Sequence, residues 1–191
     1  VLGGFTFPFS GTIYSGEDDL YVSSNGFISL GGDNGDGCCS GNPSDLINDF
    51  ARIAPIWTDL DPGDTGDVYL NTFSGGKFPE SVDRMVITWD TEFYENDGLV
   101  TVQVQLLWDG TIIMGYLSYD DNRDDDDLLI GLSPGFGVPD PGSTDLTDSV
   151  PFDSGTEPTI YDIFSSSTID RSTKHSWSPD SQWILFNGQE A

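Results

Sequence analysis

Carboxylate side chains are the groups in this chain that are dense enough to do chemistry. One stretch carries four of them within nine residues, and a second stretch is denser still. The first holds Asp59, Asp61, Asp64 and Asp67, and the second includes Asp120, Asp121, Asp124 and Asp126. Calcium takes several oxygen ligands, which closely spaced carboxylates supply. We therefore expect calcium at these stretches. The alternative is that Asp59 caps backbone amides while the rest of the first stretch lies in a turn, and that the second stretch is a solvated acidic loop.

Glycoside hydrolysis would be a different use of carboxylates. Asp90 and Glu92 are two residues apart, so both point to one side of an extended strand, and Glu95 follows closely. Such a pair can serve as nucleophile and acid, although strand ends often carry carboxylates without a catalytic task. The single His175 has no Gly-x-Ser-x-Gly motif to partner it, and no phosphate-binding Gly-rich Lys-Ser/Thr loop occurs. We expect no enzyme, with a hydrolase using Asp90 and Glu92 as the remote alternative.

The two cysteines, Cys38 and Cys39, are adjacent in the chain. Adjacent cysteines close no long loop and lack the Cys-x-x-Cys spacing of a zinc site. They lie in a Gly- and Asp-rich stretch that predicts an exposed loop, where an unpaired thiol would be reactive. We expect an oxidised form, either a vicinal bridge or a bond to another chain, with free thiols as the alternative.

The charge of the chain excludes several kinds of partner. There are 33 acidic residues against 6 basic ones, for a formal net charge of −27. A surface of this sign repels nucleic acid and anionic membranes. The sequence has no initiator Met, no signal-like leader, no apolar run of membrane-spanning length and no Asn-x-Ser/Thr sequon. We expect the mature part of a longer secreted or surface precursor, without membrane insertion in this segment, and a prokaryotic source.

Short apolar segments bounded by turn residues predict an all-β fold. Between Leu99 and Leu107 apolar and polar residues alternate, which places Val100, Val102, Val104 and Leu106 on one buried face. Asp109-Gly110 then predicts a tight hairpin turn. Other strand candidates lie within residues 5–9, 20–30, 67–73, 84–89, 111–117, 128–132 and 182–186. The pattern favours an antiparallel β-sandwich of jelly-roll type.

One short helix and a C-terminal extension complete the predicted organisation. Ser44 is a suitable N-cap, and Pro55 limits the helix to two turns. The apolar residues at helical spacing are Leu46, Ile47, Phe50 and Ile53. Residues 134–191 are rich in Pro, Gly, Ser, Thr and Asp, which predicts loops followed by a terminal strand. We expect a single domain over residues 1–191, with its main core in residues 1–133.

The order of these segments resembles the NIDO domain of nidogen- and tectorin-like extracellular proteins. The blocks that carry the resemblance are Gly4–Gly11, Tyr21–Ile28, Ile53–Asp61, Gly66–Tyr69, Val86–Trp89, Val102–Leu106, Asp109–Ile112 and Ile130–Leu132. The resemblance covers about residues 3 to 133. It implies an extracellular β-rich domain used in adhesion and matrix, with no catalytic residues to carry over. The adjacent cysteines, the Asp124–Asp127 run and the C-terminal extension depart from the pattern.

These observations lead us to expect a structural surface or matrix protein. In this reading the domain assembles into homopolymers, such as filaments or a biofilm matrix, by β-strand addition at its chain ends. The side chains expected to contact a partner are Phe5, Phe7, Phe9, Trp177, Trp183, Ile184 and Phe186. Trp57, Trp89 and Trp108 fall in apolar segments and are expected in the core. The alternative is an adhesin module that binds a carbohydrate or receptor.

Overall fold

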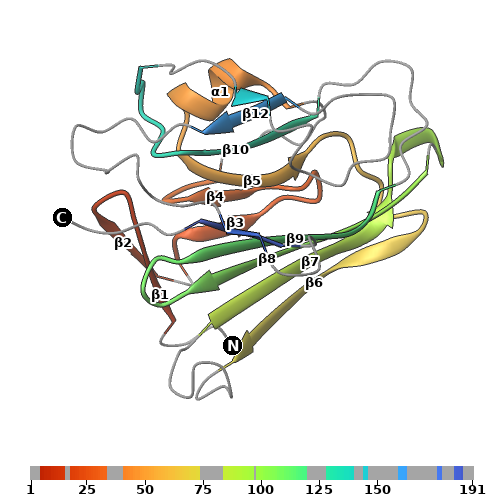
Figure 1. Cartoon of the computed structure of the whole chain (residues 1–191), viewed down its shortest axis with the longest axis horizontal. Helices are drawn as coiled ribbons and strands as arrows, with labels where there is room; N and C mark the ends of the chain where they lie inside the picture. The colour runs from red at the N-terminus through yellow and green to blue at the C-terminus, as the bar shows by residue number, and fades with distance from the viewer. Residues whose placement is uncertain are drawn as a thin grey trace.

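The structure is a computed structural model of the chain (Figure 1). It describes residues 5–15, 18–33, 41–73, 84–96, 98–119 and 128–139, together with the backbone of the strand segments 144–145, 159–162, 176–177 and 183–186. Among the described residues, no helix has the length and apolar character needed to cross a membrane.

The described strands form two six-stranded sheets and one hairpin. The first sheet has the order β11 (Thr144–Asp145), β12 (Thr159–Asp162), β10 (Leu129–Ser133), β5 (Ala51–Trp57), β4 (Ile28–Leu30), β3 (Leu20–Val22). The second has the order β13 (Ser176–Trp177), β14 (Trp183–Phe186), β9 (Ile112–Tyr119), β8 (Leu99–Leu107), β7 (Arg84–Glu92), β6 (Gly66–Phe73). The hairpin joins β1 (Thr6–Phe9) to β2 (Thr12–Ser15). The sheets lie one above the other, with the hairpin along one side (Figure 1).

The expected all-β sandwich with one short helix is confirmed. Strand pairing is antiparallel throughout the second sheet and the hairpin. In the first sheet, β10 and β12 pair in parallel, which the sequence did not predict. A parallel pair needs a long crossover connection, and the long segment between β10 and β12 provides it.

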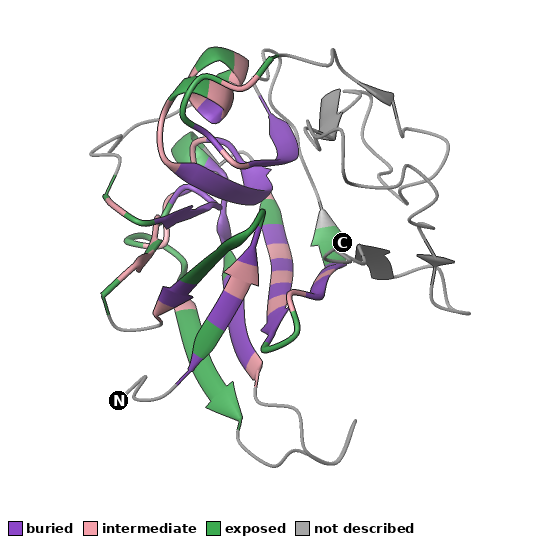
Figure 2. Cartoon of the chain, turned by 90° about the vertical axis from the view of Figure 1, so that its left-hand side faces the viewer, coloured by how far each residue is buried: buried purple, intermediate pink, exposed green. Residues whose placement is uncertain are grey.

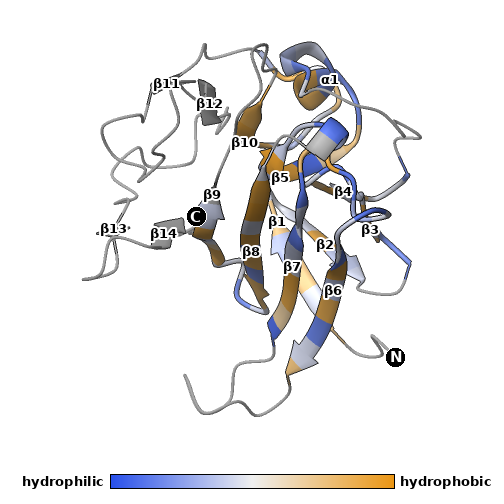
Figure 3. Ribbon diagram, turned by 90° about the vertical axis from the view of Figure 1, so that its right-hand side faces the viewer, coloured by the Kyte–Doolittle hydropathy of each residue, from blue (hydrophilic) through white to orange (hydrophobic). Residues whose placement is uncertain are grey.

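The core fills the space between the two sheets. Val100, Val102, Val104 and Leu106 on β8 are all fully buried, as their alternation predicts. From β7, Met85, Ile87 and Trp89 join the same cluster. Figure 2 shows the buried residues gathered where the sheets face each other, and Figure 3 shows hydrophobic residues along β5, β8 and β10. Burial of this apolar surface is the main stabilising term of the fold.

Strand β5 is buried on both of its faces. One face meets the main core, and the other forms a smaller cluster with Phe27, Leu46 and Leu129 beneath the helix α1 (Pro43–Asn48). An irregularity in the register between Leu129 and Gly131 inserts one residue into β5, so that Trp57 turns to the helix side. A strand covered on both faces carries a continuous apolar run instead of an alternating one.

The helix is shorter than predicted and begins earlier. Its N-cap is Asn42, whose side-chain oxygen accepts a hydrogen bond from the backbone N–H of Ser44 at 2.9 Å. Of the four residues predicted on the apolar face of the helix, only Leu46 and Ile47 lie within the helix. Phe50 follows the helix, and Ile53 lies on β5 in the main core. Antiparallel pairing with β4 and β10 takes this segment into the sheet and overrides the helical spacing.

The predicted turn between β8 and β9 is confirmed, but the prediction for Trp108 is wrong. Gly110 has φ of +86°, and Asp109 accepts a hydrogen bond from the backbone N–H of Thr111 at 3.0 Å. β8 ends at Leu107, so Trp108 falls in the turn and is 52% exposed. The apolar run therefore extends one residue past the strand. Trp57 and Trp89 are buried as expected.

Candidate binding face

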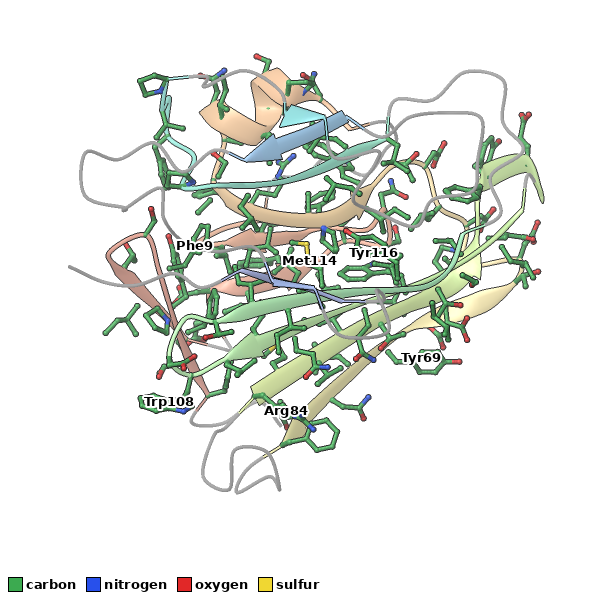
Figure 4. The ribbon with its side chains drawn as sticks, in the orientation of Figure 1. Phe9, Tyr69, Arg84, Trp108, Met114 and Tyr116 are labelled. Atoms are coloured by element: carbon green, nitrogen blue, oxygen red, sulfur yellow. The ribbon has the colours of Figure 1, made fainter. Side chains whose placement is uncertain are left out.

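The face of the second sheet that points away from the core combines exposed aromatic rings with polar side chains. Along each strand the residues alternate between this outer face and the core. The register places Tyr69 of β6 opposite Thr88 of β7, and Thr88 opposite Gln103 of β8. Figure 4 shows Tyr69 and Arg84 on the outer side of the sheet, whereas Met114 and Tyr116 point between the sheets.

A chain of hydrogen bonds links the polar side chains of this face across two strands. The Gln103 Nε2 group donates to Thr88 Oγ1 at 2.9 Å, and Gln105 Nε2 donates to Gln103 Oε1 at 3.1 Å. Arg84 then donates to Gln105 Oε1 at 3.3 Å. All four side chains are half-buried, so each is in contact both with the sheet and with solvent. We call Thr88, Gln103, Gln105 and Arg84 the polar ladder.

Two aromatic rings of β6 flank the polar ladder. The guanidinium of Arg84 lies over the ring of Phe73 at 4.9 Å from its centroid, which is cation–π geometry. Tyr69 is 48% exposed and stands beside the Thr88 end of the ladder. The ring of Tyr69 is therefore available for stacking next to hydrogen-bonding groups of fixed orientation.

One end of the face is acidic. Asp67 and Asp90 lie opposite each other on β6 and β7, and both are exposed. Thr101 donates a hydrogen bond to Asp90 Oδ1 at 2.8 Å, and Ser118 donates to Thr101 Oγ1 at 2.9 Å. Asp67, Asp90 and Thr101 form one row across the strands. It lies two residues along the strands from the row of Tyr69, Thr88 and Gln103. The carboxylates thus border the polar ladder without entering it.

The structure does not gather the predicted calcium ligands Asp59, Asp61, Asp64 and Asp67 into one group. Within the described ranges, no cluster of three or more His, Cys, Asp or Glu side chains is placed to hold a metal ion. Asp61 accepts a hydrogen bond from the backbone N–H of Gly63 at 2.9 Å, and Asp67 accepts one from Val68 at 2.8 Å. Asp61 thus lies at a turn, as the alternative expects, whereas Asp67 lies on strand β6. Asp120, Asp121, Asp124 and Asp126 lie outside the described residues, as do Cys38 and Cys39.

The carboxylates of the hydrolase alternative do not face a common solvent space. Asp90 is exposed and bound by Thr101, whereas Glu92 is only 6% exposed. Glu95 is exposed on the short 3-10 turn η1 (Tyr94–Asn96) that follows β7. Glycoside hydrolysis needs both carboxyl groups to flank the same bond of a substrate. The burial of Glu92 therefore gives this alternative no support.

The predicted partner-contact residues are placed within the fold of their own chain. Phe5, Phe7 and Phe9 are buried in the main core and not displayed to a partner, because the β1–β2 hairpin packs its apolar face inward. At the other end of the chain, β14 pairs with β9 and β13 pairs with β14. Trp177, Trp183, Ile184 and Phe186 lie on these two strands, and the structure describes only their backbone.

Sequence reasoning missed the polar ladder, Tyr69 and a buried arginine. The polar residues Gln103 and Gln105 alternate with the core residues of β8, so one strand of the ladder was readable from the sequence. Arg52 is fully buried on β5, and its guanidinium lies 4.0 Å from the centroid of Trp57 and 4.5 Å from that of Phe27. It also forms an ion pair of 3.4 Å with Asp49. No local pattern distinguishes a buried arginine from an exposed one.

Comparison with known proteins yields a family but no individual relative. Searches of curated proteins and of solved structures gave no match. The family model described as NIDO related matches residues 3–180. The match extends well beyond residue 133, so most of the segment that the resemblance left unexplained is part of the family pattern. This chain therefore belongs to the NIDO-related family.

Proposed function

We propose that this domain is a non-enzymatic extracellular module that joins copies of itself into surface or matrix polymers by strand addition at β6. Membership of the NIDO-related family supports an extracellular setting. The proposal moves the docking element away from the chain ends, because β1 and β14 each pair with strands of the same chain. The exposed edge strand β6 is the observation that carries it.

Strand β6 has the features of an edge that accepts another strand. It is eight residues long and, among the strands that the structure describes, it is the last of its sheet. All of its residues except Val68 are exposed (Figure 2). The large apolar side chains among them are Tyr69, Leu70 and Phe73, at 48%, 40% and 42% exposure. Edge strands are ordinarily shortened, charged or covered to prevent pairing, and β6 carries only one charged residue, Asp67.

Strand addition also suits a highly acidic protein. Two copies with a net charge of −27 each repel one another over their surfaces. Backbone hydrogen bonds along an edge provide attraction that does not depend on side-chain charge. We further propose that calcium, held by the acidic stretches that include Asp120–Asp127, lowers this repulsion and stabilises the assembly.

Two neighbouring proline substitutions test the role of β6. In an antiparallel pair, successive residues direct their backbone N–H groups alternately toward the partner strand and away from it. Of Leu70→Pro and Asn71→Pro, one therefore removes a hydrogen bond to β7 and the other removes only a donor of the free edge. The variant that removes only the free-edge donor should melt like the wild type and fail to assemble. Sizing and negative-stain microscopy, with and without calcium, measure assembly.

A charge variant gives an independent readout. Leu70→Glu keeps every backbone donor but adds a carboxylate to the edge, which should weaken assembly without unfolding the domain. The matched control is Ile13→Glu, at an exposed apolar position on β2. A wild-type protein that stays monomeric both with and without calcium contradicts the proposal. The proposal is also contradicted if Leu70→Glu and the proline variant that stays folded each form polymers of normal length.

A further inference from the structure

We propose that the outer face of the second sheet binds a neutral polysaccharide through Tyr69 and the polar ladder. This site shares Tyr69 with β6, but its polar ladder lies on β7 and β8, so binding does not require self-assembly. It combines one exposed aromatic ring with several oriented hydrogen-bonding groups on a rigid sheet. Ligand sites of this composition use the aromatic side chain for contact area and the polar groups for orientation.

Within the part of the chain that the structure describes, the hydrogen-bonding capacity of the ladder is only partly used. A glutamine amide carries two donor hydrogens and two acceptor lone pairs. Gln103 donates once to Thr88 and accepts once from Gln105, and Gln105 donates once to Gln103 and accepts once from Arg84. Each amide therefore keeps one donor and one acceptor for a ligand. Each hydroxyl group of a sugar can both donate and accept a hydrogen bond. Two adjacent hydroxyl groups therefore match the remaining donor and acceptor of one amide.

The internal hydrogen bonds also prepare the ladder for binding. A free glutamine side chain loses rotamer freedom when it binds a ligand, which weakens the affinity. Here Gln103 and Gln105 are already held in place by one another and by Thr88 and Arg84. The face thus presents oriented amides at a low entropic cost.

The register sets the direction in which the ligand lies. Tyr69, Thr88 and Gln103 occupy one row across three adjacent strands. Neighbouring strands are about 4.8 Å apart, so the row is about 10 Å long. The ring of Tyr69 at one end can stack on the apolar face of a sugar, while the hydroxyl and amide groups bind the next sugar along. An extended glycan chain would therefore cross the strands.

The charge distribution selects neutral ligands. The domain carries a net charge of −27, and Asp67 and Asp90 border the face. A polyanionic glycan would be repelled by both, whereas an uncharged one would not. A second copy of the chain is a poorer occupant, because it would have to remove water from the polar ladder.

Affinity electrophoresis tests this assignment with the intact chain. Native gels are cast with mixed-linkage β-glucan, xylan, galactomannan or dextran as neutral polymers, and with alginate as the polyanion. We expect at least one neutral polymer to retard the wild type and alginate to leave its mobility unchanged. Tyr69→Ala and Gln103→Ala should each weaken binding about tenfold, the effect of losing one good stacking or hydrogen-bonding contact. Tyr69→Phe keeps the ring and should bind within about twofold of the wild type.

Two controls separate the face from other surfaces. Tyr21 has a similar exposure, 41%, but lies on β3 of the first sheet, so Tyr21→Ala should bind like the wild type. Gln103 lies on β8, two strands from the free edge, so a loss of binding in Gln103→Ala is independent of strand addition. Melting curves confirm that each variant is folded. The assignment is overturned if no neutral polymer retards the wild type, or if Tyr69→Ala and Gln103→Ala bind normally.

Discussion

Tyr116 shows how a single polar atom can be held inside this sandwich. It lies on β9 in the main core, where its hydroxyl donates a hydrogen bond to the backbone oxygen of Pro55 at 2.8 Å. This bond joins the second sheet to β5 of the first. Burial raises the pKa of Tyr116 well above the ordinary value of 10.0, because a phenolate would lose its hydration.

The raised pKa of Tyr116 has a consequence for stability in alkali. In the unfolded chain the group ionises near pH 10.0, whereas the folded state keeps it protonated. Its contribution is thus fully present below pH 10.0 and is lost as pH rises toward the folded-state pKa. We expect Tyr116→Phe to lower the free energy of unfolding at neutral pH by about 1–2 kcal/mol and to make it fall less steeply above pH 10.0.

Chemical denaturation at a series of pH values measures this difference. The control is Tyr69→Phe, at an exposed tyrosine on β6, which should leave the free energy of unfolding at neutral pH unchanged. Equal alkaline slopes for the wild type and Tyr116→Phe would show that Tyr116 does not contribute to the loss of stability.

At the scale of elements, Arg52 is central to the packing of β5 beneath the helix. Its planar guanidinium lies over both Phe27 and Trp57, whose ring centroids are 4.9 Å apart, and its ion pair reaches Asp49 at the C-terminal end of α1. The stacked cation contributes both charge–quadrupole attraction and packing area. Arg52 therefore links β5 to the residue that precedes β4 and to the residue that caps α1.

Substitutions at Arg52 should separate shape from charge. Arg52→Lys keeps the charge but has no planar group to lie over the two rings, so we expect it to destabilise the domain by about 2 kcal/mol. Arg52→Met removes the buried charge at similar volume and should cost less than Arg52→Lys. Asp49→Asn, at a half-exposed partner, should change stability by under about 1 kcal/mol. Thermal melts rank the variants, and a lysine variant as stable as the wild type would argue against a stacked cation.

For the whole molecule, charge repulsion is the dominant electrostatic term. A net charge of −27 favours expansion of the chain, and salt screens this repulsion. We expect the melting temperature to rise with NaCl. If calcium binds the acidic stretches, CaCl2 at the same ionic strength should raise it further by about 3 °C or more, equivalent to about 1 kcal/mol.

A chelator and a second cation complete this measurement. EGTA should reverse the additional rise, and MgCl2 should reproduce little of it, because magnesium demands a smaller and more rigid ligand shell. Identical melting curves in NaCl and CaCl2 at equal ionic strength would show that calcium acts only by screening charge.

The sequence by itself determined the class of fold, most of the strands and part of the core. Side chains of a strand alternate between two faces, and the apolar set seeks the face away from water, so Val100 and Val104 were readable as core residues. The turn at Asp109-Gly110 followed from local chemistry in the same way. The order of such segments along the chain was sufficient to indicate the family.

Only the tertiary structure decided which segments meet and which faces stay open. Ile53 belongs to a strand covered on both sides, and residues Ile53–Trp57 form a continuous apolar run without a period that distinguishes strand from helix. Thr88 and Gln103 are 15 residues apart and meet through the register of β7 with β8. That register depends on the lengths of the turns and on the packing of the opposite face, which no single segment encodes. The polar ladder and the free edge of β6 are therefore properties of the assembled sheet.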